Sequence, residues 1–368
     1  MSRIVRNTIG MAACGLVISF ASSVMAVTAN PLENAYWRFE EGTSGAQVAG
    51  ATDNTVLDSA HQNHMQTDSA TTAPTYTSAV APTPLKSGFA DNVALDFQTD
   101  DNLFAKNSTN ATGGKNINNG MIGPPTGPGV SGITIEAAFR PSVVDSLFHA
   151  IIGKDGAPIS GNPVQTLVLK VRGDTNKLQI EQFDGSGVSR QVSSLSTINA
   201  NQWYYAAVVN DSSTLTLYLD SNDGNGYQFQ GSTALAGGAM WQGANHDSYS
   251  QAWTIGRGQY GGGATDFFNG VIDEVQITNR ALAPWEFLFA PQGDYNGDKI
   301  VDAGDYAIWR KTNIFGAQGY TTWRNNFGKD YNLVGSGSVT TSIPEPASLV
   351  IAVIALAGVA TVRRRNRQ

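Results

Sequence analysis

The 368-residue sequence has a single cysteine, Cys14, and only 14% of its residues are charged. One thiol cannot form an intramolecular disulfide, and Cys14 lies in an N-terminal segment that we expect to be removed. A disulfide framework and a thiol nucleophile are therefore both excluded. The charged fraction is well below the roughly 25% of ordinary soluble domains, which argues against a helical bundle, a coiled coil or a disordered chain. Gly-x-Ser-x-Gly, His-Glu-x-x-His and a phosphate-binding glycine loop with lysine are also missing from the sequence.

Glycine is abundant instead, with 40 residues where average usage of about 7% would give roughly 26. Between residues 27 and 290, short apolar or alternating runs are separated by Gly, Asn, Asp and Ser clusters, and no long helical period occurs. Strands are expected at residues 35–40, 93–97, 132–139, 150–153, 166–171, 177–183, 203–210, 214–220, 252–256 and 270–278. Many short strands between turn residues are typical of an all-β antiparallel sandwich.

The N-terminal residues 1–26 have the pattern of a secretory signal peptide. Arg3 and Arg6 precede an uncharged apolar run at residues 9–20, and small residues then lead to Ala26, where we place the cleavage site. An amphipathic first helix is the alternative interpretation. The pattern predicts an exported protein that signal peptidase processes.

The C-terminal residues 343–368 carry a second export-related pattern. Pro344, Glu345 and Pro346 precede the uncharged run 347–362, which is shorter than the roughly 20 residues that span a bilayer, and four arginines follow. The order resembles the PEP-CTERM sorting signal, which implies cleavage by a membrane-bound exosortase near the Pro-Glu-Pro. A permanent anchor with basic residues inside is the alternative.

Six of the 23 Lys and Arg residues lie in these two ends, so the part of the chain between them is strongly acidic. An acidic surface repels phosphate backbones, so nucleic acid is not expected as a partner. The expected location is the cell envelope or surface, with transient anchoring by the short C-terminal hydrophobic helix until processing.

Several of the expected strands carry a family resemblance. The blocks Tyr36-Trp37-Arg38-Phe39-Glu40, Ala94-Leu95-Asp96-Phe97, Ile133-Thr134-Ile135-Glu136, Trp203-Tyr204-Tyr205 and Gly270-Val271-Ile272-Asp273-Glu274-Val275 are similar to the LamG-like jelly roll. This resemblance implies that residues 27–290 form a concanavalin A-like sandwich of the kind shared by laminin G, pentraxin and legume-lectin domains.

The same fold includes glycosidases, whose laminarinase-type members place two carboxylates on alternate residues of one strand. The Glu-x-Asp-x-Glu pattern of those members does not occur here, and the adjacent Asp273 and Glu274 would point to opposite faces of a regular strand. We expect Asp273 to satisfy a turn and Glu274 to pair with a base such as Arg280. A non-catalytic domain is therefore predicted, with a glycoside hydrolase or polysaccharide lyase as the alternative.

Two binding sites on the sandwich are possible from the sequence. The resemblance implies calcium at the rim of the sandwich, with Asp101, Asn102 and Asp266 as the candidate ligands. A metal-free alternative is sugar stacking on aromatic loop residues with amides that exchange hydrogen bonds. Its candidate residues are Trp241, Asn245, Tyr249, Gln259 and Tyr260.

Residues 294–305 have the spacing of a calcium-binding loop. Oxygen ligands fall at loop positions 1, 3, 5, 9 and 12, and a backbone carbonyl can fill position 7. The predicted ligands are Asp294, Asn296, Asp298, Ile300, Asp302 and Asp305. Lys299 occupies position 6, where the turn favours glycine because φ is positive there.

A short repeat follows this loop. Tyr306-Ala307-Ile308-Trp309-Arg310 recurs in form as Tyr320-Thr321-Thr322-Trp323-Arg324, which predicts two short helices packed through their tryptophans. Loop and helices, at residues 291–333, resemble the type I dockerin and imply an EF-hand-like module that docks on a cohesin. The second half lacks the Asp-x-Asn-x-Asp ligands, so a spacer or a module that docks on an envelope protein is the alternative. Residues 334–342 are expected to be a flexible linker.

Taken together, the sequence predicts an exported, non-catalytic surface protein that binds polysaccharide or another extracellular ligand and uses Ca²⁺. A structural component of the surface matrix is a further alternative. Jelly-roll specificity lies in loop geometry, so the ligand itself is not predicted.

Overall fold

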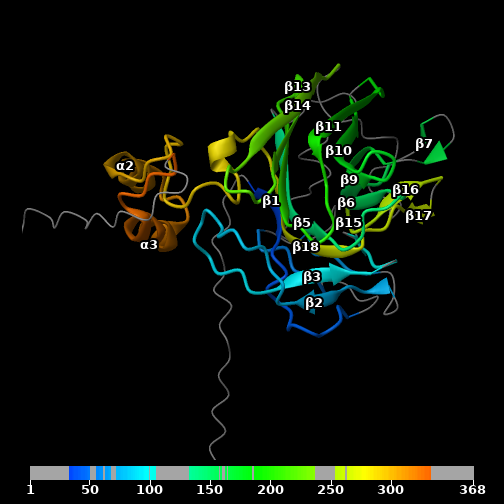
Figure 1. The fold of residues 1–368 in the computed structure, drawn as a ribbon, viewed down its shortest axis with the longest axis horizontal. Helices are drawn as coiled ribbons and strands as arrows, with labels where there is room; N and C mark the ends of the chain where they lie inside the picture. Colours follow the sequence, from blue (N-terminus) through cyan, green and yellow to red (C-terminus); the bar gives the residue numbers. More distant parts are fainter. Residues whose placement is uncertain are drawn as a thin grey trace, which may run out of the picture.

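The computed structural model describes residues 33–49, 55–60, 63–67, 72–98, 100–104, 132–156, 158–159, 162–163, 165–184, 186–236, 253–261 and 263–332. Two antiparallel sheets pack as a sandwich, and two short helices lie to one side of it (Figure 1). The predicted all-β antiparallel sandwich is thus confirmed. The signal peptide, the linker at 334–342 and the sorting signal with its hydrophobic helix lie outside the described residues.

The first sheet has eight strands in the order β14-β13-β12-β5-β18-β3-β2, and β1 also pairs with β18. Its strands are β1 (Glu33–Trp37), β2 (Thr75–Thr77), β3 (Ala94–Phe97), β5 (Ile133–Pro141), β12 (Tyr204–Asn210), β13 (Thr214–Asp220), β14 (Gln228–Ala234) and β18 (Gly270–Thr278).

The second sheet has six strands in the order β11-β10-β9-β6-β15-β4, and two small hairpins are added to the sandwich. Its strands are β4 (Leu103–Phe104), β6 (His149–Lys154), β9 (Leu167–Arg172), β10 (Lys177–Phe183), β11 (Ser189–Thr197) and β15 (Trp253–Ile255). The hairpins are β7 (Pro158–Ile159) with β8 (Asn162–Pro163), and β16 (Gly258–Tyr260) with β17 (Gly263–Thr265).

The core lies between the two sheets and follows the period-two alternation of the strands. Leu215, Leu217 and Leu219 of β13 are buried in it, whereas Thr216 and Tyr218 are partly exposed. A second apolar layer covers the outer face of the first sheet, where Tyr205 packs on Phe289 with ring centroids 4.4 Å apart. The first sheet is therefore buried on both faces around this layer.

Two strands pair in succession with one edge of β18. Residues Gly270–Ile272 pair with β3 and Val275–Thr278 pair with β1, while β5 lies along the opposite edge. The register with β5 shifts between Asp273 and Gln276, and Glu274 has a positive φ of 48°. This is a β-bulge at the point where the pairing changes from β3 to β1.

The bulge contradicts the expectation that Asp273 and Glu274 point to opposite faces, whereas the expected pairing of Glu274 with a basic residue is confirmed. Their carboxyl groups do not lie on opposite faces, because both interact with Asp91. Glu274 forms an ion pair with Arg38 at 2.7 Å, and Arg280 pairs instead with Glu286 at 2.8 Å. A regular strand would have separated the two carboxylates, but the extra residue of a bulge re-aims one side chain.

The two predicted helices are present, as α2 (Ala303–Thr312) and α3 (Gly316–Asn326), after the short 3-10 helix η3 (Pro284–Glu286). Asp302 caps α2 by accepting a hydrogen bond from the backbone N–H of Gly304. Trp309 and Trp323 each pack against Tyr306 and Tyr320, with ring centroids 5.0–5.7 Å apart. No helix among the described residues is long and apolar enough to cross a membrane.

The helical module is held against the sandwich by hydrogen bonds to segment 85–88. Lys86 is buried and its ammonium group donates to the backbone carbonyl of Asp294, while burial lowers the pKa of Lys86 to about 8. Gln318 and Thr322 of α3 donate to the carbonyls of Gly88 and Ser87, at 2.8 and 3.1 Å. These contacts fix the module on the sandwich.

We predict that Gly256→Ala lowers the free energy of unfolding by about 3 kcal/mol, because the added methyl group meets the Phe97 ring in a left-handed backbone conformation. Gly256 has φ of 82°, and a Cβ there would lie 2.4 Å from Phe97. Gly224→Ala is the matched control, since φ is 86° with no atom within 4 Å. It should cost only about 1 kcal/mol. Urea denaturation measures both, and equal costs would contradict the packing argument.

Candidate ligand pocket

A pocket of about 460 Å³ opens on the outer face of the second sheet. In β9 and β10 the core side chains include Leu169 and Ile180, so their neighbours Lys170 and Glu181 face away from the core. The β16–β17 hairpin forms a wall beside them. The lining residues are Phe148, Gln165, Val168, Lys170, Glu181, Phe183, Gln259, Tyr260, Thr265 and Asp266.

One ion pair lies in the pocket. The Lys170 ammonium group is 3.0 Å from Glu181 Oε2, and it also lies 5.1 Å from the centre of the Phe148 ring. Ser189 Oγ and Gln191 Nε2 donate to the other oxygen of Glu181, at 2.9 and 3.0 Å. The pair is thus oriented by its surroundings, although neither side chain is completely buried.

The two acids of the pocket have opposite pKa shifts. Burial would raise the pKa of Glu181, but Lys170 and the hydroxyl and amide donors outweigh it, so the pKa is lowered. Burial raises the pKa of Asp266, and Lys170 offsets this only in part. One ionised carboxylate and one carboxyl group that retains its proton more readily therefore face the same lysine.

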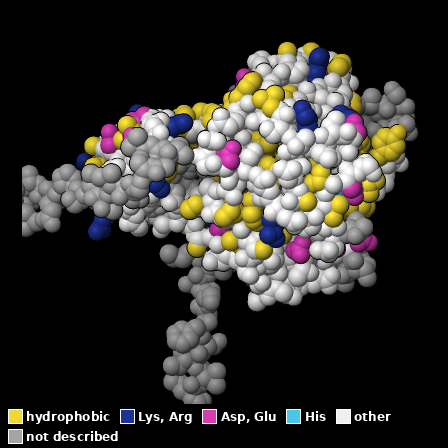
Figure 2. Space-filling model, in the orientation of Figure 1, with side chains coloured by type: hydrophobic (Ala, Val, Ile, Leu, Met, Phe, Trp, Pro, Cys, Tyr) yellow, Lys and Arg dark blue, Asp and Glu magenta, His cyan; other side chains and the backbone are white. Residues whose placement is uncertain are grey.

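The hairpin presents an aromatic ring beside these charges. Tyr260 is 71% exposed, whereas its neighbour Gln259 is buried and accepts a hydrogen bond from the backbone N–H of Gly156 at 3.2 Å. With Phe148 and Phe183 also in the lining, the pocket combines apolar rings with groups that donate and accept hydrogen bonds. On the face of the molecule in Figure 2, charged side chains are few and scattered.

Three of the residues predicted from the sequence, Gln259, Tyr260 and Asp266, lie together in this pocket. The candidates Trp241, Asn245 and Tyr249 lie outside the described residues.

The other two rim-calcium candidates are not in the pocket lining. Asp101 accepts a hydrogen bond from the backbone N–H of Gln98 at 2.7 Å, and the Asn102 amide donates to the carbonyl of Asp100 at 3.2 Å. Sequence reasoning missed Phe148, Lys170, Glu181 and Phe183. The alternation within residues 166–171 and 177–183 was the signal that could have placed Lys170 and Glu181 on the outer face.

The predicted calcium loop winds around two buried carboxylates. Asp294 accepts from the backbone N–H of Gly297 and Lys299, at 2.7 and 2.9 Å. Asp305 accepts from Tyr295 and Asn296 with one oxygen and from Asp302 with the other, at 2.6–3.0 Å. Both side chains are at most 1% exposed.

The loop residues fit calcium in kind and in order. Lys299 has φ of 68°, so position 6 adopts the left-handed turn although it is not glycine. Burial and the nearby Asp294 carboxylate raise the pKa of Asp305, which a cation between them would reverse. The loop acids do not lie this close together, however. In the described part of the chain, the one group of three carboxylates with oxygens within 4.8 Å of one another is Glu40, Asp91 and Glu274.

Residues 122–286 match the model of the concanavalin A-like lectin/glucanases superfamily. The match contains every residue of the pocket and ends before the helical module. It agrees with the LamG-like resemblance of the sandwich. No curated protein matches the chain in sequence.

Solved structures with a similar fold include three carbohydrate-associated proteins. The CBM40 of the Ruminococcus gnavus IT-sialidase, bound to α2,3-sialyllactose, is 11% identical over 46% of this chain and 89% of its own, with a TM-score of 0.34. Domain 4 of AbnA, a GH43 extracellular arabinanase from Geobacillus stearothermophilus, in complex with arabinotriose, is 13% identical over 68% and 94%, with a TM-score of 0.39. The Trypanosoma rangeli sialidase in complex with sialic acid is 11% identical over 68% and 31%, with a TM-score of 0.37.

We predict that Lys170→Gln raises the pKa of both Glu181 and Asp266, because the substitution removes the cation that favours their ionised forms. Carbon-detected NMR titration of the side-chain carboxyls measures both values. Lys311→Gln, at the exposed end of α2, is the control and should leave both unchanged. An unchanged Glu181 titration in Lys170→Gln would show that the ion pair does not form.

Proposed function

We propose that the sandwich is a non-catalytic carbohydrate-binding domain and that its ligand, a segment of polysaccharide, binds in the pocket formed by β9, β10 and the β16–β17 hairpin. The observation that carries the proposal is the juxtaposition of an exposed ring, Tyr260, with the oriented Lys170–Glu181 pair. The match of residues 122–286 to a superfamily of lectins and glucanases supports a carbohydrate ligand.

A sugar has chemistry that this lining fits. Its C–H faces pack on aromatic rings, as Phe148, Phe183 and Tyr260 would allow, and its hydroxyl groups both donate and accept hydrogen bonds. Lys170 can donate to a hydroxyl oxygen and Glu181 can accept from a hydroxyl group. The volume of about 460 Å³ lies within the roughly 300–1,000 Å³ of small-molecule sites, so a few sugar units rather than one ion would fill it.

A glycoside hydrolase is the second candidate, and one observation favours it. The pocket holds two acids whose environments push their pKa values apart, Glu181 downward and Asp266 upward. Such a pair can supply a carboxylate and a proton donor. Reducing-sugar release from a polysaccharide panel decides between the two candidates: we expect retention without release, and release that Glu181→Gln abolishes would establish the hydrolase.

We predict that Tyr260→Ala weakens polysaccharide binding by about tenfold, equivalent to ~1.4 kcal/mol, because the stacking surface is lost. The ligand is chosen on a glycan array with the purified chain and the affinity is measured by calorimetry. Phe229→Ala removes an aromatic ring that is 55% exposed on β14, outside the pocket, and should leave the affinity unchanged. No retention of any glycan would contradict the carbohydrate proposal and leave a protein-binding or surface-matrix role.

For the helical module we propose one Ca²⁺ held by the side chains of Asp294, Asn296, Asp298, Asp302 and Asp305 and the carbonyl of Ile300. Its charge would neutralise the buried Asp294 and Asp305 carboxylates. We predict that Ca²⁺ protects the module from limited proteolysis, and that Asp298→Asn abolishes this protection at 1 mM Ca²⁺ because a charged ligand is lost. Asp330→Asn, a partly exposed acid outside the loop, is the control.

Export and attachment are proposed on the sequence patterns of the two ends. Signal peptidase and an exosortase would process the chain, which would then act at the cell envelope or surface or be released from it. A cohesin-like or envelope protein is the proposed partner of the helical module. Pro344→Ala with Pro346→Ala should leave the C-terminal arginines on the chain, which mass spectrometry of the processed protein detects.

A further inference from the structure

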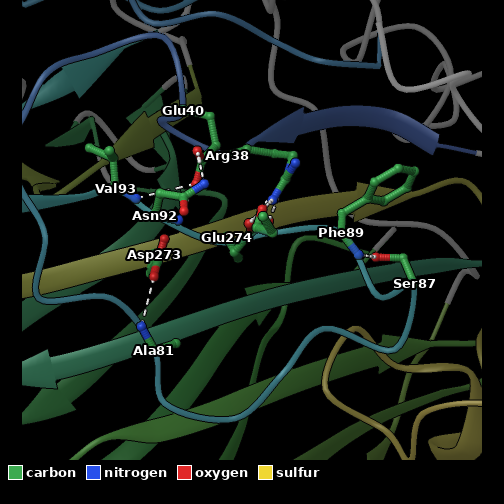
Figure 3. A network of polar contacts seen from close by, with 10 residues as sticks. Arg38, Glu40, Ala81, Ser87, Phe89, Asn92, Val93, Asp273 and Glu274 are labelled. Carbon is green, nitrogen blue, oxygen red and sulfur yellow. Dashed lines mark hydrogen bonds and ion pairs between the residues drawn. The ribbon is translucent and has the colours of Figure 1, made fainter. Parts of the chain in front are cut away.

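Four carboxylates meet where the pairing of β18 changes from β3 to β1. Strand β1 ends at Trp37 beside Val275 of β18, and β3 begins at Ala94, one residue before Leu95, which pairs with Ile272. The chain places Glu40 just after β1 and Asp91 just before β3, and the bulge of β18 supplies Asp273 and Glu274 between them. Figure 3 shows the labelled members of this acidic cluster converging from separate segments of the chain.

The positions of three of these carboxylates suit a shared ligand. One oxygen each from Glu40, Asp91 and Glu274 lies within 4.8 Å of the others. Glu40 is oriented by the backbone N–H groups of Asn92 and Val93, which donate to its Oε1 at 2.6 and 3.2 Å. The backbone of Asn92 and Val93 therefore holds Glu40 in the cluster even though like charges repel.

The fourth carboxylate has a buried oxygen with no partner. Asp273 is 0% exposed, and its Oδ2 accepts a hydrogen bond from the backbone N–H of Ala81 at 2.9 Å. Its Oδ1 has no donor among the described residues, and neither has either carboxylate oxygen of Asp91. Asp91 and Asp273 also lie within hydrogen-bonding reach of each other. When both acids are ionised, three buried oxygens in the cluster thus lack a donor.

A single basic side chain, Arg38, does not balance the negative charges of the four carboxylates. Arg38 Nη2 lies 2.7 Å from Glu274 Oε1 and also donates to the carbonyl of Ala90 at 2.6 Å. It is the one basic side chain that forms an ion pair with the cluster among the residues that the structure describes. Burying unpaired carboxylates is costly, so a further cation is expected between them.

We propose that a Ca²⁺ ion binds in the acidic cluster, with Glu40, Asp91 and Asp273 as ligands and Glu274 shared between the ion and Arg38. The ligands are all oxygens and mostly charged, which favours a hard divalent cation over zinc or copper. Ca²⁺ accepts the irregular arrangement of several carboxylates better than Mg²⁺, which requires near-octahedral geometry and retains water. The ion would join the end of β1, the start of β3 and the bulge of β18.

This site is separate from the loop at residues 294–305, so the two calcium proposals are tested together in the full chain. Calorimetric titration of the calcium-free protein should give two sites for the wild type, one for Asp91→Asn, one for Asp298→Asn and none for the double variant. Asp223→Asn, an exposed turn acid, should retain both sites. Two sites remaining in Asp91→Asn would overturn the cluster proposal. Two sites remaining in Asp298→Asn would overturn only the loop proposal.

Thermal unfolding supplies an independent readout. In the Asp298→Asn background, 1 mM Ca²⁺ should raise Tm by about 5 °C relative to chelator, and adding Asp91→Asn should abolish this rise. In chelator, Asp91→Asn should have the higher Tm, since it removes one of the repelling charges from the cluster. Glu40→Gln is the second variant if Asp91→Asn does not fold. Equal Tm values with Ca²⁺ and chelator in the Asp298→Asn background would mean that the acids share protons, and would overturn the proposal.

Discussion

Two strands pair with the same edge of β18, and the arrangement of the first sheet depends on how β18 accommodates both. Strands β3 and β1 pair with successive halves of β18, so the strand must change partner midway. The bulge at Glu274 makes this possible at the cost of a left-handed backbone at a non-glycine residue. Arg38 compensates by pairing with Glu274, and this pair links residues 236 positions apart in the sequence. The N-terminal strand is thus attached to the sheet through polar contacts as well as its ladder.

The candidate pocket is separated from this junction by the core, because it lies on the second sheet. Regular alternation in β9 and β10 sends Leu169 and Ile180 inward and leaves Lys170 and Glu181 outside. The hairpin that carries Tyr260 begins two residues after Gly256, whose positive φ turns the chain against Phe97. Binding groups thus lie on strands whose positions the core fixes, which limits the ordering required when a ligand binds.

The sequence predicted the fold better than it predicted the site, for physical reasons. The bounds of β10, β13 and β18 were predicted at both ends, since each alternates or is continuously apolar between turn residues. Strands β11 and β14 were missed because these outer strands expose most of their residues and are polar. The predicted orientation of the Asp273 and Glu274 side chains was wrong, because a β-bulge leaves no sign in the alternation of apolar and polar residues along the sequence. Gln259, Tyr260 and Asp266 were found, but their partners Lys170 and Glu181 come from strands distant in sequence.

The attachment of the helical module to segment 85–88 bears on how the protein could hold two partners at once. A module on a flexible linker samples many orientations, so two binding events are coupled only through an effective concentration. Here Lys86, Gln318 and Thr322 fix the module against the sandwich, and the face of α3 that carries these contacts is already covered. A partner of the module would therefore bind a face other than this one, and any sugar in the pocket would then be held at a fixed distance and angle from that partner.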